Sequence, residues 1–492
     1  MNEHSYIACD LGAGSGRVIL GRLRDGKISL EEVHRFVSPP VNLCGTLRWN
    51  IIQIFEELKI GLRKVAAAGE TPASVSVDSW GVDYVLLNKQ QPMLGLPYNY
   101  RDARTDAPFA AAMEEPGPAL IFEETGIQFM PLNTLYQLIA DVEQNRDLLE
   151  VADRFLHIAD YVNFLFCGVG KVEESLASTT QMYNPRTRSW SKKLMTACKL
   201  PERIFPEIVP SGTRLGTFLP QLQEETGLGK IEVIATCSHD TGAAVAAIPA
   251  AEKDWAFLSS GTWSLMGVEL PQPLINEEAR RHDFTNEAGY GGTTRFLKNM
   301  NGMWIIAECR RAWLAKGIDR DFAELVRLAG IEEPLRSLIN PNAARFSKPD
   351  DMPAKIRRYC EETGQPVPES QGQIARCILE SLALLYRKTI DELRALTGRD
   401  VRTLHIVGGG SQNTLLNQFA ANATNCQVIA GPVEATAAGN VLIQAITLGH
   451  VASLQNAREL VRASFSVQEF QPQRSAEWQQ AYERFSKLDL TT

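Results

Sequence analysis

Three short glycine-rich segments could bind a nucleotide, and the first runs from Asp10 to Arg17 with the letters DLGAGSGR. Glycines let backbone amides approach phosphate oxygens, the Ser15 hydroxyl adds a donor, and a carboxylate at the end of a strand, here Asp10, can stand near hydrated magnesium. The run lacks the GK[ST] ending of a Walker loop, and it leads into a strand, unlike a dinucleotide fingerprint. The pattern predicts a phosphate site, and a glycine hairpin without a ligand is the alternative.

The other two glycine-rich segments lie in the second half of the chain. Residues Ser259 to Thr262, with the letters SSGT, repeat the arrangement of a strand, a small-residue turn and a second strand. Two such turns could bind a triphosphate from two sides. The run Gly408-Gly409-Gly410 lies between a predicted strand and a predicted helix. It would let an adenine or a ribose approach the backbone closely, although a plain strand-to-helix turn is the alternative.

Asp240 is the candidate catalytic residue. It follows a predicted strand and begins a predicted helix of small residues, so helix capping is one explanation for it. The other explanation is a general base, which accepts the proton of a hydroxyl as that hydroxyl attacks phosphorus. The small residues after Asp240 leave room for a phosphate at the helix N-terminus. The sequence leaves both explanations open.

A second candidate contact with substrate is the run Trp80-Gly81-Val82-Asp83, which follows a predicted strand. A tryptophan beside a glycine and an acid could pack on a sugar ring while the polar groups bind its hydroxyls. Packing of Trp80 in the protein core is the alternative.

These motifs need an α/β scaffold to position them, and the hydrophobic patterns predict one in each half of the chain. The order of a strand, a small-residue turn and a second strand occurs in both halves, which suggests two related halves, although two unrelated hairpins would look the same. The predicted strands are 6–10, 18–23, 28–36, 73–77, 231–235, 255–259, 263–268 and 403–407, and the predicted helices are 51–65, 242–248 and 373–396, with another from about residue 413. Residues 101–210 read as insertions that cover a sheet.

Composition narrows the class of protein further. The 50 Lys and Arg residues against 58 Asp and Glu residues give a formal net charge of −8, which argues against a broad surface for nucleic acid or anionic membranes. No apolar run approaches the ~18 residues of a membrane span, and the start lacks a signal peptide, so we expect a cytoplasmic protein. Nine cysteines without a CxxC pattern predict reduced thiols and no zinc site. Only the pairing of Cys360 with Cys377 stays open.

The chain resembles the rhamnulokinases, a group within the FGGY family of carbohydrate kinases, over nearly its whole length. Some of the matching glycine turns are shared by all actin-like ATPases. The segments SWGVDYVLL, GIQFMPLNTLYQL and GGGSQNTLLNQFAANA favour this group over glycerol or xylulose kinases. The other matching segments are DLGAGSGR, HDTGAA, FLSSGTWSLMG, KNMNGMW, IVGGGSQN and GPVEATAAGN.

The resemblance implies ATP-dependent phosphorylation of L-rhamnulose at its 1-hydroxyl with Mg²⁺, giving L-rhamnulose 1-phosphate and ADP in the breakdown of L-rhamnose. The implied fold is α/β, with two actin-like (ribonuclease H-like) ATPase domains and a central cleft. Residues 1–212 would form the sugar-side domain with the phosphate turn, and residues 213–492 the nucleotide-side domain. The implied partners are the sugar and ATP, with no nucleic acid or membrane, in a monomer or homodimer.

Site residues carry over by motif. Asp240 would accept the proton. The ketose would bind to Gly81, His239, Asp240, Thr241 and Asn299, and ATP to Ala13, Gly14, Ser15, Gly16, Arg17, Thr262, Gly409 and Gly410. One departure concerns the helix after Asn299, where the family pattern leads us to expect a glutamine in the nucleotide pocket and this chain has Ala307. The adenine side of the site is therefore the part that the resemblance specifies least.

Other functions remain as alternatives. Within the kinases, L-fuculokinase or another ketose kinase is the nearest competitor. In a different class, an actin-fold ATPase that drives conformational change would share the phosphate turns but would not need Asp240 or a sugar pocket. A sugar-sensing relative without catalysis is disfavoured, because the acid and both phosphate turns are present.

Overall fold

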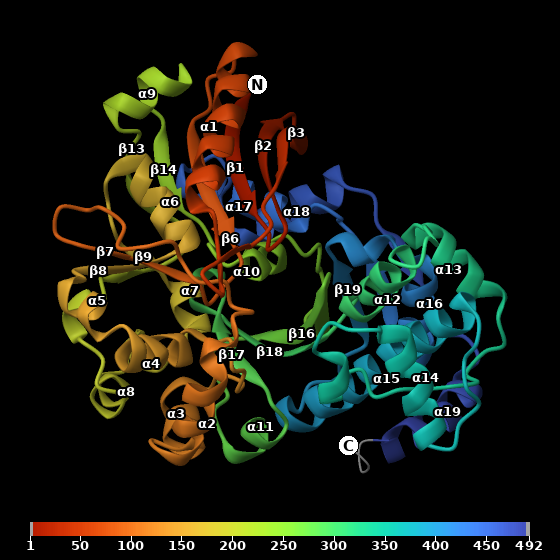
Figure 1. Cartoon of the computed structure of the whole chain (residues 1–492). Helices are drawn as coiled ribbons and strands as arrows, with labels where there is room; N and C mark the ends of the chain where they lie inside the picture. Colours follow the sequence, from red (N-terminus) through yellow and green to blue (C-terminus); the bar gives the residue numbers. More distant parts are fainter. Residues whose placement is uncertain (1–2, 489–492) are drawn as a thin grey trace. The chain divides into compact units, whose positions relative to one another are not determined.

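The computed structural model describes residues 3–488, and the chain divides into two compact units (Figure 1). Unit 1 combines residues 1–249, 269–296 and 435–464, and unit 2 combines residues 250–268, 297–434 and 465–492. Each unit therefore joins segments that are far apart in the sequence. The domain division that we expect after residue 212 stays a prediction.

Unit 1 is built on a six-stranded sheet with the order β13-β14-β6-β1-β2-β3. β1 pairs antiparallel with β2 and parallel with β6, and β6 pairs parallel with β14. The strands predicted from the sequence for this half are confirmed, with ends shifted by a few residues. Their bounds are β1 His4–Leu11, β2 Ser15–Arg24, β3 Lys27–Val37, β6 Ser74–Ser79, β13 Thr213–Thr217 and β14 Glu232–Ala235.

Helices cover both faces of this sheet. A Cβ atom on Gly61 of α1 (Ile51–Ala67) would lie 2.4 Å from Val18, and one on Gly21 would lie 2.7 Å from Val441 of α17 (Ala435–Thr447). Val18 and Gly21 are three positions apart in β2, so their side-chain directions point to opposite faces. α1 and α17 therefore pack on opposite faces. α1 buries one helical stripe made of Ile51, Ile54, Leu58, Leu62 and Val65, as its sequence predicts.

The β4–β5 pair precedes β6 in the chain, and the segment after β6 adds small helices and further short strand pairs to unit 1, as the alternation of helical patterns and turn signals predicts. The helices are α2 Asp106–Glu114, α3 Pro118–Thr125, α4 Thr134–Gln144, α5 Arg146–Val151, α6 Ile158–Cys167, α7 Glu174–Thr179, α8 Lys192–Ala197 and α9 Pro220–Thr226. The strands are β4 Val41–Leu43, β5 Thr46–Arg48, β7 Tyr84–Leu87, β8 Arg154–His157, β9 Val172–Glu173, β10 Tyr183–Asn184, β11 Ser189–Trp190 and β12 Ile208–Val209. Unit 1 is completed by α10 Asp240–Ala246, α11 Glu277–Arg281, β17 Thr285–Ala288 and α18 Leu454–Ser464.

The second large sheet has the order β17-β18-β16-β15-β19-β20-β21. Its strands in or entering unit 2 are β15 Trp255–Ser260, β16 Trp263–Leu270, β18 Thr294–Asn301, β19 Thr403–Val407, β20 Gln427–Ala430 and β21 Gln468–Phe470. The helices of unit 2 are α12 Trp304–Leu314, α13 Phe322–Ile331, α14 Met352–Glu362, α15 Gln371–Thr397, α16 Thr414–Thr424 and α19 Ser475–Leu488. The long helix α15 begins with a capping box in which Ser370 and Gln373 exchange hydrogen bonds.

The two units share a local arrangement. In unit 1 the hairpin of β1 and β2 adds β6 parallel to β1, and in unit 2 the hairpin of β15 and β16 adds β19 parallel to β15. The repeat that the sequence suggests is therefore present in the strand pairing, with a small-residue turn at the tip of each hairpin.

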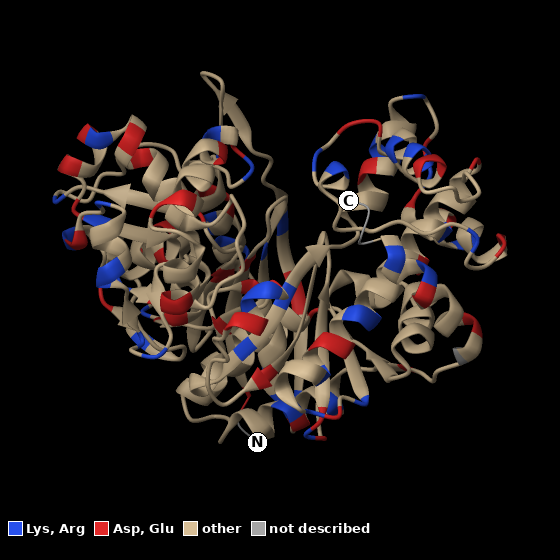
Figure 2. Cartoon of the chain, turned by 90° about the horizontal axis from the view of Figure 1, so that it is seen from below, with Lys and Arg blue, Asp and Glu red and all other residues tan. Residues whose placement is uncertain are grey.

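Charge and thiol chemistry agree with the composition. Figure 2 shows acidic and basic residues interspersed along the ribbons of both units. All nine cysteines are free, and Cys360 and Cys377 are buried thiols that share a hydrogen bond. Within the part of the chain that the structure describes, no helix is both long enough and apolar enough to cross a membrane.

We predict that Gly439→Ala destabilises unit 1 strongly, because the new Cβ atom would lie 1.8 Å from the backbone oxygen of Ala243 in α10. A backbone oxygen cannot rotate away as a side chain can, so we expect a loss of about 1–3 kcal/mol in the free energy of unfolding. Urea unfolding of the variant and of the wild type measures this loss. The matched control is Gly229→Ala, whose Cβ would meet nothing within 4 Å; equal stability of both variants would contradict the prediction.

Candidate active site

Three carboxylates meet at one edge of the sheet of unit 1. Asp10 ends β1 and lies directly beside Asp78 in the parallel pair of β1 and β6. Asp240 begins α10 shortly after β14, the next parallel strand. The backbone amide of Ser79 donates to the carbonyl of Ser238 at 2.8 Å, which ties this loop to β6. The carboxyl ends of neighbouring parallel strands are where open α/β sheets bind ligands.

The pKa values of Asp78 and Asp240 are both raised in this site. Asp78 is completely buried, and burial followed by the charge of Asp10 raises its pKa well above the usual value. The pKa of Asp240 is raised as well, first by burial and then by Asp10, while His239 opposes the shift. Arg17 forms an ion pair with Asp10 and neutralises part of the charge. A site with this excess of negative charge favours a cation.

The Asp240 carboxylate remains reachable, because its side chain keeps 34% of its surface exposed. Its Oδ1 atom accepts hydrogen bonds from the amide of Thr241 at 2.6 Å and from the Thr241 hydroxyl at 3.2 Å. The N-cap position of α10 belongs to His239, which makes no side-chain capping bond. Capping therefore does not account for Asp240. Within the described residues, no hydrogen bond uses its Oδ2 atom, which leaves an acceptor for a substrate hydroxyl.

Asp78 is a site residue that the sequence analysis missed. The amide nitrogen of Asn440 in α17 donates to Asp78 Oδ2 at 2.6 Å. Gln444, one turn further along α17, donates to Asn440 Oδ1 at 2.7 Å and to the carbonyl of Ile7 at 3.0 Å, and it accepts from Ser74 at 2.6 Å. This chain of hydrogen bonds fixes the buried carboxylate against β1 and β6. The only local signal was an Asp near the end of an apolar strand.

Glu173, also missed, positions the loop before Asp240. Its Oε2 atom accepts the backbone amide of Ser238 at 3.0 Å and the hydroxyl of Ser175 at 2.5 Å, and its Oε1 atom accepts the hydroxyl of Ser211 at 2.5 Å. The Ser175 hydroxyl in turn accepts the amide of His239 at 3.0 Å. The buried carboxylate of Glu173 therefore binds the amide of Ser238 directly and the amide of His239 through the Ser175 hydroxyl. Both residues directly precede α10.

His239 lies between Asp240 and a buried ion pair. Arg295, which is fully buried, lies 2.9 Å from Glu287. His239 Nδ1 lies 3.2 Å from both Arg295 Nη2 and Glu287 Oε2, and His239 Nε2 is 3.4 Å from Asp240 Oδ1. Burial would raise the pKa of Glu287, but Arg295 and His239 outweigh it and lower that pKa.

The turn from Trp80 to Asp83 is strained. Val82 has a φ of 70°, and the amide of Asp83 donates to the carbonyl of Gly81 at 2.9 Å, which makes a γ-turn. A positive φ is costly for a β-branched residue, and such strain clusters at functional sites. A Cβ on Gly81 would lie 2.9 Å from the hydroxyl of Thr179, so only glycine fits there without rearrangement.

Trp80 belongs to the core, which is the alternative to stacking on a sugar that the sequence left open. Its ring centroid lies 4.2 Å from that of Trp49, and only 6% of its surface is exposed. The indole nitrogens of Trp49 and Trp80 donate to Asp83 Oδ2 at 2.6 Å and 2.9 Å, and Gln137 donates to Oδ1 at 3.0 Å. The hydrogen bonds of Asp83 to buried side chains therefore hold the γ-turn against the core. Burial raises the pKa of Asp83 to about 6.

The predicted phosphate turn of unit 1 has an open tip. The amide of Gly12 donates to the carbonyl of Ser15 at 2.8 Å, and Ala13 and Gly14 are exposed. A Cβ on Gly14 would meet nothing within 4 Å, so a ligand has room there, whereas one on Gly16 would lie 2.2 Å from the ring of Phe36. Arg17, predicted to contact ATP, is engaged by Asp10.

Unit 2 brings its own predicted residues together. The carbonyl of Thr262 accepts the amides of Gly302 and Trp304 at 3.2 Å and 3.1 Å. A Cβ on Gly410 would lie 2.0 Å from the Ser260 hydroxyl, whereas one on Gly409 would meet nothing within 4 Å. The Gly408-Gly409-Gly410 turn therefore packs directly on the Ser260–Thr262 turn. Asn299 is half-buried in β18, and Ala307 is half-buried in α12.

We predict that Glu173→Gln lowers the free energy of unfolding by about 1–3 kcal/mol at pH 8, because one acceptor oxygen becomes a donor that faces other donors. Urea unfolding of the variant measures this loss. The control is Glu207→Gln, which alters an exposed partner of Lys171 on the neighbouring strand pair. Equal stability of Glu173→Gln and wild type would remove Glu173 from the support of the loop.

We also predict that tryptophan fluorescence titrates with a midpoint near pH 6, because protonation of Asp83 weakens both indole hydrogen bonds. The folded-state pKa lies above the usual 3.8. The protonated form therefore stabilises the fold fully below pH 3.8, and this contribution is lost as the pH rises through about 6. Asp83→Asn should abolish the transition; a transition that persists in this variant would assign it to another group.

Known proteins match the whole chain. The model of the FGGY family of carbohydrate kinases, N-terminal domain, matches residues 5–247, and that of the C-terminal domain matches residues 256–448. A rhamnulokinase of Bacteroides thetaiotaomicron is 45% identical over 98% of this chain and 99% of its own. A rhamnulokinase of Ligilactobacillus salivarius is 40% identical over 97% and 98%.

Solved structures share the fold at low identity. A ligand-bound xylulose kinase from Lactobacillus acidophilus has a TM-score of 0.83 at 16% identity, over 99% of this chain and 98% of its own. A glycerol kinase from Plasmodium falciparum with ADP has a TM-score of 0.80 at 16% identity, over 99% and 98%. With both domain models matched in order along the chain, this protein belongs to the FGGY family of carbohydrate kinases.

Proposed function

We propose that this kinase transfers the γ-phosphoryl group of ATP to the 1-hydroxyl of L-rhamnulose, giving L-rhamnulose 1-phosphate and ADP. The choice of sugar rests on the rhamnulokinases that are 45% and 40% identical over nearly their full length. The observation in the site that supports the chemistry is Asp240, a carboxylate that remains partly exposed beside two other acids.

In this proposal Asp240 is the general base. Its raised pKa increases its basicity, and Oδ2 is the oxygen that accepts the proton of the sugar hydroxyl. That hydroxyl oxygen then forms the new bond to phosphorus, and the bond between this phosphorus and the oxygen bridging to ADP breaks. His239, whose Nε2 atom lies 3.4 Å from Asp240 Oδ1, would help to position the Asp240 carboxylate. Gly81, Thr241 and Asn299 would bind the other sugar hydroxyls.

ATP would bind the two glycine-rich turn regions. Ala13, Gly14, Ser15 and Gly16 would offer backbone amides to phosphate oxygens. Thr262 and the open Gly409-Gly410 turn would bind the rest of the nucleotide. In unit 1, Arg17 would join the phosphate contacts when a cation shares Asp10.

Asp10 would stand near Mg²⁺, and the residues fit this role. The Asp78 Oδ1 atom is buried without a hydrogen-bond partner, and the pKa of Asp78 is raised by burial and by the charges of Asp10 and Asp240, so added positive charge is favourable. Within the described residues no three acidic, histidine or cysteine side chains form a complete metal centre. Mg²⁺ keeps several waters and binds substrate phosphates, so its binding does not require three protein ligands. When bound, Mg²⁺ neutralises the charge that develops on the phosphate oxygens.

The proposed reaction uses intracellular ATP and a small sugar, so we propose that the enzyme works in the cytoplasm as a monomer or homodimer, without nucleic acid or membrane partners. L-Fuculose is the competing substrate. ADP release measured across L-rhamnulose, L-fuculose, L-ribulose, D-xylulose and glycerol tests the choice of sugar. A higher kcat/KM for any sugar other than L-rhamnulose would overturn it.

We predict that Asp240→Asn lowers kcat by about 100-fold or more while the free energy of unfolding changes little, because the amide keeps the shape but cannot accept the proton. Coupled ADP release with L-rhamnulose measures this. Asp147→Asn, which changes an exposed acid on α5 of the same unit, is the control. Near wild-type turnover of Asp240→Asn would show that another group is the base.

A further inference from the structure

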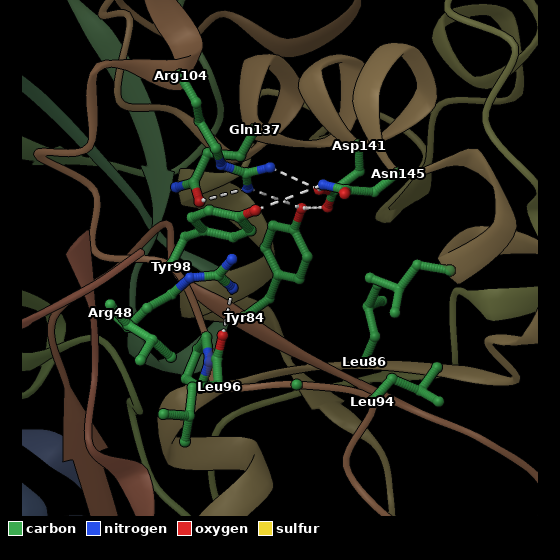
Figure 3. A pocket seen from close by; sticks show the side chains of 14 residues that line it. Arg48, Tyr84, Leu86, Leu94, Leu96, Tyr98, Arg104, Gln137, Asp141 and Asn145 are labelled. Carbon is green, nitrogen blue, oxygen red and sulfur yellow. Dashed lines mark hydrogen bonds and ion pairs between the residues drawn. The ribbon is translucent and has the colours of Figure 1, made fainter. Parts of the chain in front are cut away.

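Unit 1 contains a cavity of about 280 Å³ that none of the proposed sugar or nucleotide residues lines (Figure 3). Its wall comes from the β4–β5 hairpin, from β7, from the segment after β7 and from α4 and the residue that follows it. The volume lies just below the ~300–1,000 Å³ usual for ligand pockets, so the cavity would hold a small ligand. The residues that matter for its chemistry are Arg48, Tyr84, Leu86, Leu94, Tyr98, Arg104 and Asp141.

Two guanidinium groups enclose one aromatic ring in this wall. The central carbon of Arg48 lies 3.3 Å from the ring centroid of Tyr98, and that of Arg104 lies 3.5 Å from the same centroid. Two groups this close to one centroid cannot share a face of the ring, so they cover opposite faces. The attraction of each cation to the ring is worth about 0.5–2 kcal/mol. The two like charges, however, repel each other.

Only one of these charges is neutralised within the cavity. Asp141 binds Arg104 Nη1 at 2.5 Å, and the same carboxylate also accepts the Tyr84 hydroxyl and, at 3.1 Å, the Asn145 amide. The bonding capacity of Asp141 is therefore used (Figure 3).

Arg48 has neutral partners instead. It donates to the carbonyl of Leu96 at 2.7 Å and to the Thr46 hydroxyl at 3.0 Å. Within the described residues no carboxylate forms an ion pair with it. The carboxylate of Asp102 accepts the amides of Leu47 and Arg104 instead. The wall therefore carries two cations and one anion, and a half-buried cation without a counter-ion favours an added anion.

The remaining wall is apolar. Leu86 and Leu94 lie together across the cavity from the charged cluster (Figure 3), and Leu43, Leu96 and Leu148 also line the cavity. Leu86 is buried, whereas Leu43 keeps 50% of its surface exposed. A ligand that fits this wall must place an acidic group at Arg48 and an apolar body on the leucines.

We propose that this cavity is a binding site for a small organic anion, in which one carboxylate or phosphate group pairs with Arg48 and an apolar body packs on Leu86 and Leu94. A guanidinium recognises both acid groups in the same way, through parallel N–H donors. The proposal does not depend on the sugar that the enzyme phosphorylates, because the cavity shares no residue with the proposed active site.

The test is calorimetric titration of the full-length protein with 4-phenylbutyrate and with phenyl phosphate, and with the neutral 4-phenylbutyramide as the matched uncharged probe. We expect saturable binding of at least one anion, with the amide at least about tenfold weaker, the effect of losing one charged contact. The two anions distinguish a carboxylate site from a phosphate site. Equal affinity for the amide and both anions would overturn the proposal, as would a lack of saturable binding.

Variants locate the site. Arg48→Gln should weaken the favoured anion by about tenfold or more and leave the amide unchanged, whereas Arg35→Gln, an exposed arginine paired with Glu32, should change neither. Leu94→Glu adds a carboxylate to the opposite wall and should abolish anion binding without removing Arg48. Wild-type anion affinity in either cavity variant would place the bound anion elsewhere and refute the assignment.

Discussion

The central constraint on unit 1 is repulsion among acids held together by strand pairing. The parallel register of β1 and β6 places Asp10 beside Asp78, and the loop after β14 adds Asp240. Bringing like charges into a buried site is costly, and the raised pKa values of Asp78 and Asp240 record that cost. A cation repays it. Arg17 supplies one now, and the proposed Mg²⁺ and its nucleotide would supply more, so substrate binding relieves a strain that the fold imposes.

The surrounding structure resists the tendency of these acids to separate. The contact between Gly439 and Ala243 lets α17 lie close against α10, and from there Asn440 reaches the buried Asp78. Glu173 supports the loop before Asp240. It accepts the amide of Ser238 directly, and it binds the Ser175 hydroxyl, which accepts the amide of His239. These supports are hydrogen bonds to buried groups, whose loss leaves an unsatisfied partner. The site is therefore rigid before any ligand arrives.

Residues whose contact partners lie nearby in the sequence were predicted, and residues whose partners lie far away in the sequence were missed. The glycine turns, their flanking strands and Asp240 were found because each signal lies within a few neighbouring residues. Asp78 was missed because its partner Asn440 is 362 positions away, and Glu173 because its loop is 65 positions away. The position of Trp80 stayed open for the same reason: Trp49 and Asp83 bury it, and only Asp83 is near in sequence. The roles proposed for Asn299, Thr262 and Gly409 remain predictions.

The repeated hairpin has different residue types at the strand ends in the two units. In unit 1 the strand before the turn ends near Asp10 and its parallel neighbour carries Asp78. In unit 2 the corresponding strand ends in Ser259 and Ser260, and its neighbour β19 ends in Val407 before glycine. Hydroxyls and amides can bind phosphate or ribose but cannot accept a proton from a sugar hydroxyl at neutral pH. This charge difference supports the proposal that proton transfer and the cation belong to unit 1, and that unit 2 would bind the nucleotide through neutral groups.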